Sequence, residues 1–298
     1  MTGASGLIGR SLCERLTAAG HIVVALVRRP PMSDGEAAWS PDQGIAEPAK
    51  LGALDGVIHL AGENIAAGRW TRRRMEAIRR SRVDATRRLV DSFAALSNPP
   101  RSLLCASAVG IYGDRGDEQL DESSPAGQGF LAEVCTAWEA AAATAERFGA
   151  RRLSLRLGVV LTPSGGALAR MLPVFRWGLG AVMGDGRQHL AWVSIDDAVG
   201  AMLHILDHEE LRGPVNLVAP EAVTAAAFAQ ALAAALGRRV LLRLPGSVLR
   251  ALLGRMADET LLASTRVSPR KLLDSGYRFR HPCLTGTLSS LLGGVAPA

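Results

Sequence analysis

The first apolar residues of the chain recur at helical spacing and are followed by a continuous apolar run. Ile8, Leu12 and Leu16 form one stripe of a helix that ends before Gly20. Residues 22–27 are then all apolar, which is typical of a strand buried on both faces of a parallel sheet. The pattern predicts a helix followed by a parallel strand.

The same alternation of apolar runs and amphipathic helices continues along the chain. Strands are predicted at 37–39, 56–60, 103–106, 153–161, 191–195 and 215–218. Helices are predicted at 71–96, 130–148, 167–177, 196–207 and 284–292, and a glycine-rich flap at 178–188. Repeated strand–helix units indicate an α/β protein with a Rossmann-like doubly wound parallel sheet and a smaller C-terminal α/β substrate cap.

The predicted organisation has two parts. Residues 1–160 form a dinucleotide-binding domain, and residues 190–220 return to its sheet. Residues 161–189 and 221–298 form the substrate cap.

A glycine-rich turn opens the chain. Gly3 permits a tight turn, Gly6 lets the backbone approach a pyrophosphate, and Gly9 lets the helix pack closely on the sheet. Backbone N–H groups and the helix dipole would hold the phosphates. The residues predicted to bind the cofactor here are Gly3, Ser5, Gly6, Leu7, Ile8 and Gly9.

The strand that should precede this turn is short. Only Met1 and Thr2 stand before Gly3, whereas a central strand needs about five residues. We therefore expect the native chain to begin upstream of Met1, and the intact mass of protein expressed from the native locus tests this expectation.

Further cofactor contacts are predicted at the ends of the strands. Arg28 and Arg29 follow the second strand, where an acidic residue would bind the ribose of NAD and an arginine the 2′-phosphate of NADP. We therefore favour NADP(H) over NAD(H). Small residues at the next strand ends would let a dinucleotide lie close. These further candidates are Leu60, Ala61, Gly62, Glu63 and Ala106.

Three polar residues fall at positions expected to be buried. Arg82 lies on the apolar stripe of the helix predicted at 71–96, so it should meet a carboxylate or a phosphate, and we include it among the cofactor contacts. Arg156, inside an apolar strand, should have a charged partner. His59, also inside a strand, is interpreted as a hydrogen-bonded core histidine.

Composition narrows the classes of partner. The chain has 298 residues, 48% of them hydrophobic, and a net charge of +6. No apolar stretch approaches about 20 residues, so we expect no membrane span and a cytoplasmic protein. Nine arginines lie in residues 69–88, but interleaved Glu76 and Asp84 and the lack of an aromatic stacking platform argue against nucleic-acid binding. Four scattered cysteines and the pair His204 and His208 predict no metal site.

Several segments together resemble a known family. TGASGLIG, HLAGENIAAGRW, SRVDATR, SAVGIYG, GFLAEVCTAWE and WVSIDD are similar to segments of the extended short-chain dehydrogenase/reductase superfamily, and most of all to its atypical "epimerase family" subgroup. VSPRKLLDSGYRF resembles that subgroup's C-terminal domain of unknown function. The resemblance covers nearly the whole chain. It implies a Rossmann fold, an NADP(H)-type cofactor and a substrate cap, and it names no substrate.

The chain departs from the wider superfamily in its catalytic residues. Superfamily catalysis uses Tyr-x-x-x-Lys, and neither Tyr112 nor Tyr277 has a lysine four residues later. If Glu139 matches the glutamate that follows that motif, Leu131 and Cys135 occupy the tyrosine and lysine positions. The candidates for an alternative proton donor are Ser107, Tyr112, Glu133 and Cys135.

Three functions stay open on the sequence. The first is an oxidoreductase acting on a small carbonyl or hydroxyl compound with a different proton donor. The second is a non-catalytic NADP(H)-binding sensor or regulatory protein. The third is a nucleotide-sugar epimerase or dehydratase, the chemistry that depends most on the missing tyrosine. The sequence leaves the substrate and the oligomeric state open, with a homodimer as one option.

Overall fold

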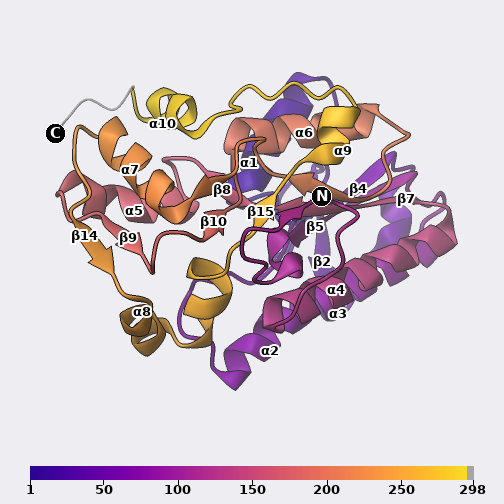
Figure 1. The fold of residues 1–298 in the computed structure, drawn as a ribbon. Coiled ribbons are helices and arrows are strands. Elements are labelled where there is room, and N and C mark those ends of the chain that lie inside the picture. Colours follow the sequence, from indigo (N-terminus) through magenta and orange to yellow (C-terminus); the bar gives the residue numbers. More distant parts are fainter. Residues whose placement is uncertain (294–298) are drawn as a thin grey trace. The chain divides into compact units, whose positions relative to one another are not determined.

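A computed structural model describes residues 1–293, and its chain forms two compact units (Figure 1). The first unit comprises Met1–Ala108, Glu133–Arg156 and Met202–Val215. The second comprises Val109–Ala132, Leu157–Ala201 and the chain from Asn216 onward. Each unit is described by itself.

The first unit is built on parallel strands. A four-stranded sheet has the order β12 (Gly213–Leu217), β7 (Arg151–Leu157), β5 (Ser102–Ala108), β4 (Gly56–His59). A second sheet has the order β1 (Ala25–Val27), β2 (Glu36–Ser40), β3 (Gly44–Ile45). Thr2 joins the two sheets, because it forms parallel bridges to Leu26 on one side and to His59 on the other. The strand order confirms the predicted doubly wound α/β fold.

The first helix and strand agree with the prediction in part. Helix α1 spans Leu7–Ala18 and buries Gly9, Leu12 and Leu16. The strand expected at 22–27 was predicted too long, because its pairing with β2 begins only at Ala25. Ile22 lies outside the strand and is 96% exposed.

The single helix predicted at 71–96 is wrong, because the structure divides it. Helix α2 spans Arg72–Arg80, α3 spans Val83–Asp91, and a 3-10 turn follows at Ser92–Ala95. The break has a local cause at the carbonyl of Ile78. The hydroxyl of Ser81 and the guanidinium of Arg82 both donate to this carbonyl, and the backbone N–H of Arg82 turns to Arg79 instead.

Parts of two further helices, residues 133–143 and 202–207, complete the first unit, and the first residues of both helices belong to the second unit. Helix α4 spans Phe130–Ala143 and continues as a 3-10 turn at Thr144–Phe148. It packs on α3, where the indole of Trp138 donates to the hydroxyl of Thr86 over 2.9 Å (Figure 1). Helix α6 spans Ile195–Asp207, and Arg151 donates to the carbonyls of Ile205, His208 and Leu211 beyond its last turns.

The second unit contains four small two-stranded sheets. These pair β8 (Val159–Leu161) with β11 (Trp192–Ser194), β9 (Ala181–Met183) with β14 (Leu242–Leu244), β10 (His189–Leu190) with β13 (Val223–Thr224), and β6 (Gln119–Leu120) with β15 (Arg266–Val267). Strand β9 occupies part of the predicted flap at 178–188. The strand predicted at 153–161 is two strands, because it breaks at Gly158, where a Cβ atom would lie 2.8 Å from the carbonyl oxygen of Ala191.

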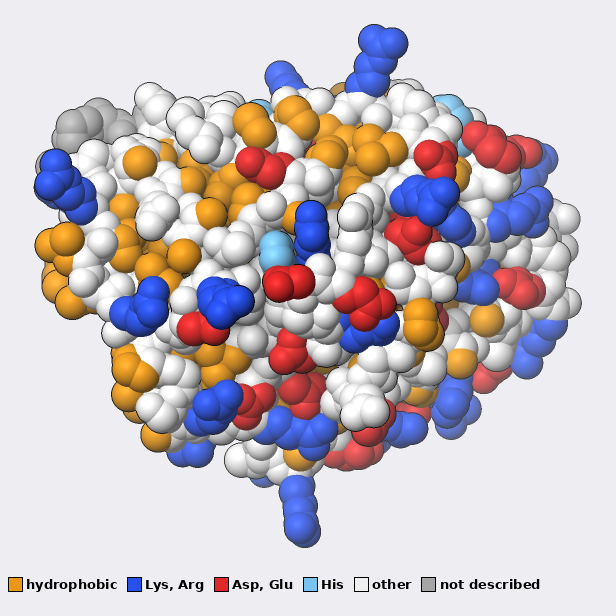
Figure 2. Space-filling model, viewed as in Figure 1, with side chains coloured by type: hydrophobic (Ala, Val, Ile, Leu, Met, Phe, Trp, Pro, Cys, Tyr) orange, Lys and Arg blue, Asp and Glu red, His pale blue; other side chains and the backbone are white. Residues whose placement is uncertain are grey.

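The helices of the second unit surround an apolar core. They are α5 (Gly166–Arg176), α7 (Ala225–Ala235), α8 (Gly246–Leu253), α9 (Arg270–Asp274), α10 (Leu284–Leu292) and a π-helix at Ala257–Leu261. Thr224 caps α7, since its hydroxyl accepts the N–H of Ala227. Hydrophobic side chains also gather on the surface over α7, β9 and β14 (Figure 2).

A buried carboxylate holds the C-terminal segment of the second unit. Asp197 is 1% exposed and accepts the backbone N–H groups of Arg280 and His281 over 2.7 and 2.9 Å. Ser194 caps the start of α6, because its hydroxyl accepts the N–H of Asp197. The N-terminal cap of α6 is therefore Ser194, and Asp197 binds the backbone of the C-terminal segment.

Candidate functional site

The glycine turn before α1 leaves no room for side chains. Gly3 has a φ of +71°, in the left-handed region, and a Cβ atom on Gly9 would lie 2.0 Å from the carbonyl oxygen of Gly3. Gly6 is the N-cap of α1, and no side chain caps the helix. Because the first N–H groups of a helix have no partner within it, those at this turn can donate hydrogen bonds to phosphate oxygens.

The end of β4 packs against this turn through Thr2. The Thr2 hydroxyl contacts Nδ1 of His59 over 2.7 Å and accepts the N–H of Ala61 over 3.2 Å. Burial lowers the pKa of His59 to about 3, so the ring is neutral. Its Nε2 atom has no hydrogen-bond partner within residues 1–293, so the expected core histidine is only half satisfied.

The two arginines after β1 differ in their surroundings. Arg29 forms a two-pronged ion pair with Glu36, with nitrogen–oxygen distances of 2.6 and 2.8 Å. This pairing lowers the pKa of the Glu36 carboxyl. Arg28 is exposed and makes no ion pair among the described residues, so its guanidinium is open to a phosphate.

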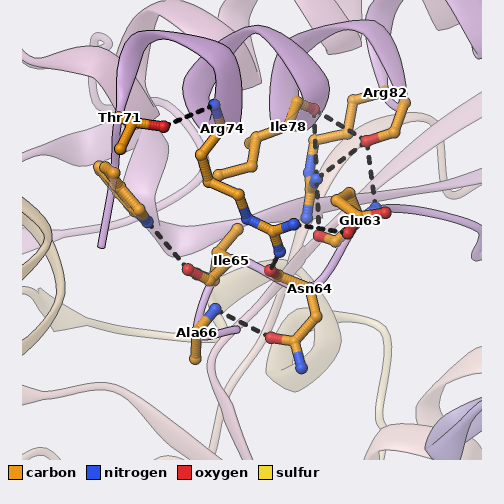
Figure 3. Close-up of polar contacts among 10 residues, drawn as sticks. Glu63, Asn64, Ile65, Ala66, Thr71, Arg74, Ile78 and Arg82 are labelled. Carbon is orange, nitrogen blue, oxygen red and sulfur yellow. Dashed lines mark hydrogen bonds and ion pairs between the residues drawn. The ribbon is translucent and has the colours of Figure 1, made fainter. Parts of the chain in front are cut away.

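Beyond β4, two arginines converge on one glutamate (Figure 3). Arg74 donates a hydrogen bond to the carboxylate of Glu63 over 2.7 Å. Arg82 instead donates to the backbone carbonyls of Glu63 and Ile78 over 3.0 and 3.3 Å. The guanidinium of Arg82 also lies 5.1 Å from the ring centre of Trp138.

The charge of Arg82 is not neutralised by an ion pair within the described part of the chain. Its opposite side faces Gly62, where an added Cβ atom would lie 3.4 Å from the guanidinium carbon. Burial lowers the pKa of Arg82, although the group remains a cation. A partly buried cation with only neutral partners favours binding of an anion.

A serine, a glutamate and an arginine form a second polar cluster. The hydroxyl of Ser107 donates to Glu139 over 2.8 Å, and Arg156 holds the same carboxylate with two nitrogens over 2.9 and 3.0 Å. The charged partner expected for Arg156 is thus confirmed as Glu139. Because its oxygens accept hydrogen bonds from both Ser107 and Arg156, Glu139 is an acceptor that orients Ser107.

Cys135 lies beside this cluster. Its side chain is 3% exposed, and burial raises the pKa of the thiol to about 11. The positive charge of Arg82 and a hydrogen bond from Ser107 act in the opposite direction, but they are weaker than the effect of burial. Cys135 is therefore a protonated thiol at neutral pH, and it is not a thiolate nucleophile.

The other predicted site residues lie in different surroundings. Tyr112 is fully buried, and its hydroxyl donates to Asn216 Oδ1 over 2.8 Å and to the carbonyl of Asp121 over 3.0 Å, so it holds loops together. Glu133 is exposed on α4, and Ala106 is buried in β5. The catalytic roles suggested for these side chains stay predictions.

One functional candidate could not have been found from the sequence. Glu259 accepts the backbone N–H groups of Phe130 and Leu131, the first residues of α4, over 3.1 and 2.7 Å. It stands 128 residues away from Leu131 in the sequence, in the π-helix of the second unit, and no local capping pattern marks it.

Residues 1–293 contain no group of three side chains able to hold a metal ion, and the rings of His204 and His208 stack with their centroids 3.7 Å apart. No helix among them has the length and hydrophobicity needed to cross a bilayer.

Comparisons with known proteins agree with this geometry. The model of the NAD dependent epimerase/dehydratase family matches residues 1–218, and a domain of unknown function, DUF1731, matches residues 244–291. The chain is 42% identical to Epimerase family protein Mb2239 of Mycobacterium bovis, over 98% of this chain and 95% of that protein.

Two solved structures are similar over nearly the whole chain. The human epimerase family protein SDR39U1, whose crystal structure contains NADPH, is 35% identical with a TM-score of 0.89, covering 99% of this chain and 98% of that one. A nucleoside-diphosphate sugar epimerase from Corynebacterium glutamicum is 35% identical with a TM-score of 0.79, covering 98% of this chain and 57% of that one. The chain therefore has a Rossmann NAD(P)-binding fold and belongs to the NAD dependent epimerase/dehydratase family, with DUF1731 at its C-terminal end.

Proposed function

We propose that this protein is an NADP(H)-dependent oxidoreductase that acts on a small carbonyl or hydroxyl compound. The observation that carries the proposal is the uncapped start of α1, where glycines at 3, 6 and 9 leave backbone N–H groups accessible. A pyrophosphate fits this turn because no Cβ atom intrudes. The bound nicotinamide would supply the hydride chemistry.

The preference for NADP(H) rests on Arg28. Its exposed guanidinium stands directly after β1 and has no ion pair in the described chain, whereas Arg29 is engaged by Glu36. A 2′-phosphate would accept charge-assisted hydrogen bonds from Arg28. The NADPH in the human relative's structure is consistent with this assignment.

Arg82 is proposed as the second cationic contact. Its uncompensated charge beside Gly62 suits an anionic group of the cofactor or substrate. Arg74 does not share this role, because its charge already meets Glu63.

Cys135 is the proposed proton donor for the carbonyl oxygen. Burial keeps its thiol protonated at neutral pH, and Ser107 lies beside it, oriented by Glu139. A group with a pKa near 11 retains its proton until an alkoxide forms and can then transfer it. Ser107 would position the substrate oxygen as a hydrogen-bond partner.

The same burial favours a second candidate function, a non-catalytic NADP(H)-binding sensor. Ser107, Tyr112 and Cys135 are each at most 3% exposed, and the hydroxyls of Ser107 and Tyr112 are already hydrogen-bonded inside the protein. A sensor needs the cofactor site alone, so the two functions differ only in turnover.

Titration with NADPH and NADH, followed by nucleotide fluorescence, tests the proposal. We expect NADPH to bind at least tenfold more tightly than NADH, and Arg28→Ala to remove most of this difference, because a charge-assisted contact is worth about 1.5–3 kcal/mol. Arg10→Ala, an exposed change on α1, is the matched control. Equal affinities for both nucleotides in the unaltered protein would contradict the preference, and absence of binding would contradict the function.

Consumption of NADPH with a panel of small aldehydes and ketones then separates enzyme from sensor. Turnover that falls in Cys135→Ala while NADPH affinity is unchanged supports the oxidoreductase. Tight binding of NADPH without turnover of any carbonyl in the panel supports the sensor.

A further inference from the structure

A cavity of about 220 Å³ lies within the second unit. Its apolar wall comes from Leu131, Leu262 and Ala263, and Gly110 lies beside Leu131, with an added Cβ only 3.2 Å from that side chain. Leu131 lies in the first turn of α4, and it would occupy the tyrosine position of the superfamily motif if Glu139 matches the glutamate that follows that motif. The volume of the cavity and its apolar wall suit a small organic ligand.

The polar wall of the cavity is predominantly acidic. It contains the carboxylates of Asp114, Asp258 and Glu259, together with one guanidinium, that of Arg250. Walls of one predominant charge raise the local concentration of ligands of the opposite charge.

The three carboxylates are not equally engaged. Arg250 pairs with Asp258 over 2.6 Å, and Arg255 pairs with Glu259 over 2.5 Å. Both oxygens of Glu259 also accept N–H groups from the start of α4. Two of the three charges are therefore already compensated.

Asp114 is the carboxylate without an ion pair in the described residues. Its Oδ1 atom accepts the backbone N–H groups of Gly116 and Ser264 over 3.3 and 3.0 Å. These bonds fix the orientation of the side chain and leave Oδ2 as an acceptor for a ligand. The lining of the cavity therefore includes one carboxylate, on the exposed residue Asp114, that is oriented by backbone N–H groups and has no ion pair among the described residues.

We infer that this cavity binds a small carbonyl compound that carries a positively charged ammonium group. The ammonium would lie against Asp114 and Asp258, and the carbon skeleton against Leu131, Leu262 and Ala263. The carbonyl rests on the proposed oxidoreductase function, whereas the charge and size of the ligand follow from the cavity itself.

The same features argue against a nucleotide sugar as the ligand. Cavities for drug-sized ligands measure about 300–1,000 Å³, so 220 Å³ is small for a sugar joined to a nucleoside diphosphate. A pyrophosphate would also face Asp114, and the nearest guanidiniums are already paired with Asp258 and Glu259. Neither size nor charge is complementary to this class of ligand.

Binding of matched probes by ligand-detected NMR, without cofactor, tests the inference. Acetonyltrimethylammonium and 4,4-dimethylpentan-2-one have the same shape and differ in the charge of one atom. We expect the cation to bind at least threefold more tightly than the neutral ketone. Anionic levulinate and UDP-glucose should bind more weakly than either. Equal binding of the two isosteres, or tighter binding of levulinate or UDP-glucose, would overturn the inference.

Variants of the cavity connect this preference to its residues. Asp114→Asn keeps the oxygen that accepts from Gly116 and Ser264 and removes the charge, so it should abolish the preference for the cation. Asp274→Asn, on α9 and outside the cavity, is the control and should retain the preference. An unchanged preference in Asp114→Asn would contradict the assignment.

A further variant tests the location without altering charge. Ala263→Trp should fill the cavity and weaken binding of both ketones by tenfold or more, with circular dichroism confirming the fold. Undiminished binding would place the ligand elsewhere. Because these measurements use no NADP(H), failure of the cavity inference and failure of NADP(H) binding are separately visible.

Discussion

The first backbone N–H groups of helices α1 and α4 differ in whether a side chain of the protein caps them. Helix α1 begins at a glycine N-cap with no capping side chain and no acidic residue in its first turn. The N–H groups at the start of α4 are instead taken by Glu259, a carboxylate from a distant part of the sequence. One helix start is left open for a ligand, and the other is closed by the protein's own anion.

The difference shows why a helix start by itself does not identify a binding site. Both helices have a positive dipole end, and the first N–H groups of each have no partner within the helix itself. At α1, glycines also allow a tight turn, since an added Cβ atom on Gly9 would lie 2.0 Å from the carbonyl oxygen of Gly3. At α4 the internal carboxylate satisfies the dipole, so the helix start contributes stability and a wall of the neighbouring cavity.

The largest effect on stability and on NADPH binding is expected from crowding the glycine turn at the start of α1. Gly9→Ala places a Cβ atom 2.0 Å from the Gly3 carbonyl oxygen and 2.9 Å from the Cα of Ala4, so the backbone must move. We expect a loss of about 3 kcal/mol or more in the free energy of unfolding, together with loss of NADPH binding. Urea unfolding and nucleotide titration measure the two effects.

Gly20→Ala is the matched control for this change. Gly20 has a φ of +85° but no atom within 4 Å of an added Cβ, so only backbone strain is introduced. We expect a cost of about 1 kcal/mol and unchanged NADPH binding. Equal effects of the two substitutions would show that crowding at the turn is not the cause.

A pH-dependent effect is expected next to the open helix start. The pKa of His59 is about 3 in the folded protein and about 6.5 in the unfolded chain, so below pH 6.5 the unfolded chain binds a proton that the folded chain does not. Stability should therefore fall as pH falls from about 6.5 toward 3, by about 2 kcal/mol at pH 5.

Urea unfolding between pH 8 and pH 4 measures this dependence. His59→Gln should flatten the profile, and His21→Gln, at an exposed position, should not. A profile that His59→Gln leaves unchanged would assign the acid sensitivity to other groups.

The fold was predictable because periodicity and glycines are local signals. The helical stripe of Leu12 and Leu16 and the apolar strand at 56–60 have the predicted element types. The divided helix near Arg82 was not predictable in this way, because apolar spacing continues through the break. The break depends on which side chains reach the Ile78 carbonyl, and that depends on three-dimensional contacts.

The part of the candidate site that depends on the local glycine turn was predictable from the sequence. The parts that depend on tertiary contacts were not. The sequence indicated the glycine turn and the need of Arg156 for a charged partner. It did not separate Arg28 from Arg29, because Glu36 becomes a partner only through the pairing of β1 with β2. Glu259 was missed entirely, since capping by a residue 128 positions away leaves no local pattern.

Removing the carboxylate that caps α4 should have a moderate effect on the free energy of unfolding. Glu259→Ala removes the acceptor of two N–H groups at the start of α4, and losing a cap costs about 0.5–2 kcal/mol. Arg255→Ala removes the ion pair to the same carboxylate and a cation–π contact with Phe130, which together should cost less than about 1 kcal/mol because Arg255 is exposed. Urea unfolding of both variants measures the difference. A cost for Arg255→Ala that equals that for Glu259→Ala would mean that the ion pair, and not the cap, is the stabilising contact.

The smallest expected effect concerns the ligand of the open helix start. In the unaltered protein, Glu36 holds Arg29 by two hydrogen bonds and places a negative charge near the proposed 2′-phosphate. Glu36→Gln removes this charge and loosens Arg29, so NADPH affinity should rise about two- to fivefold while NADH affinity stays constant, in keeping with the modest energy of exposed ion pairs. Fluorescence titration at low salt makes the gain visible, and it should shrink at high salt. A decrease in NADPH affinity would instead mean that Glu36 orients Arg29 for the phosphate, which would make the ion pair part of the binding site.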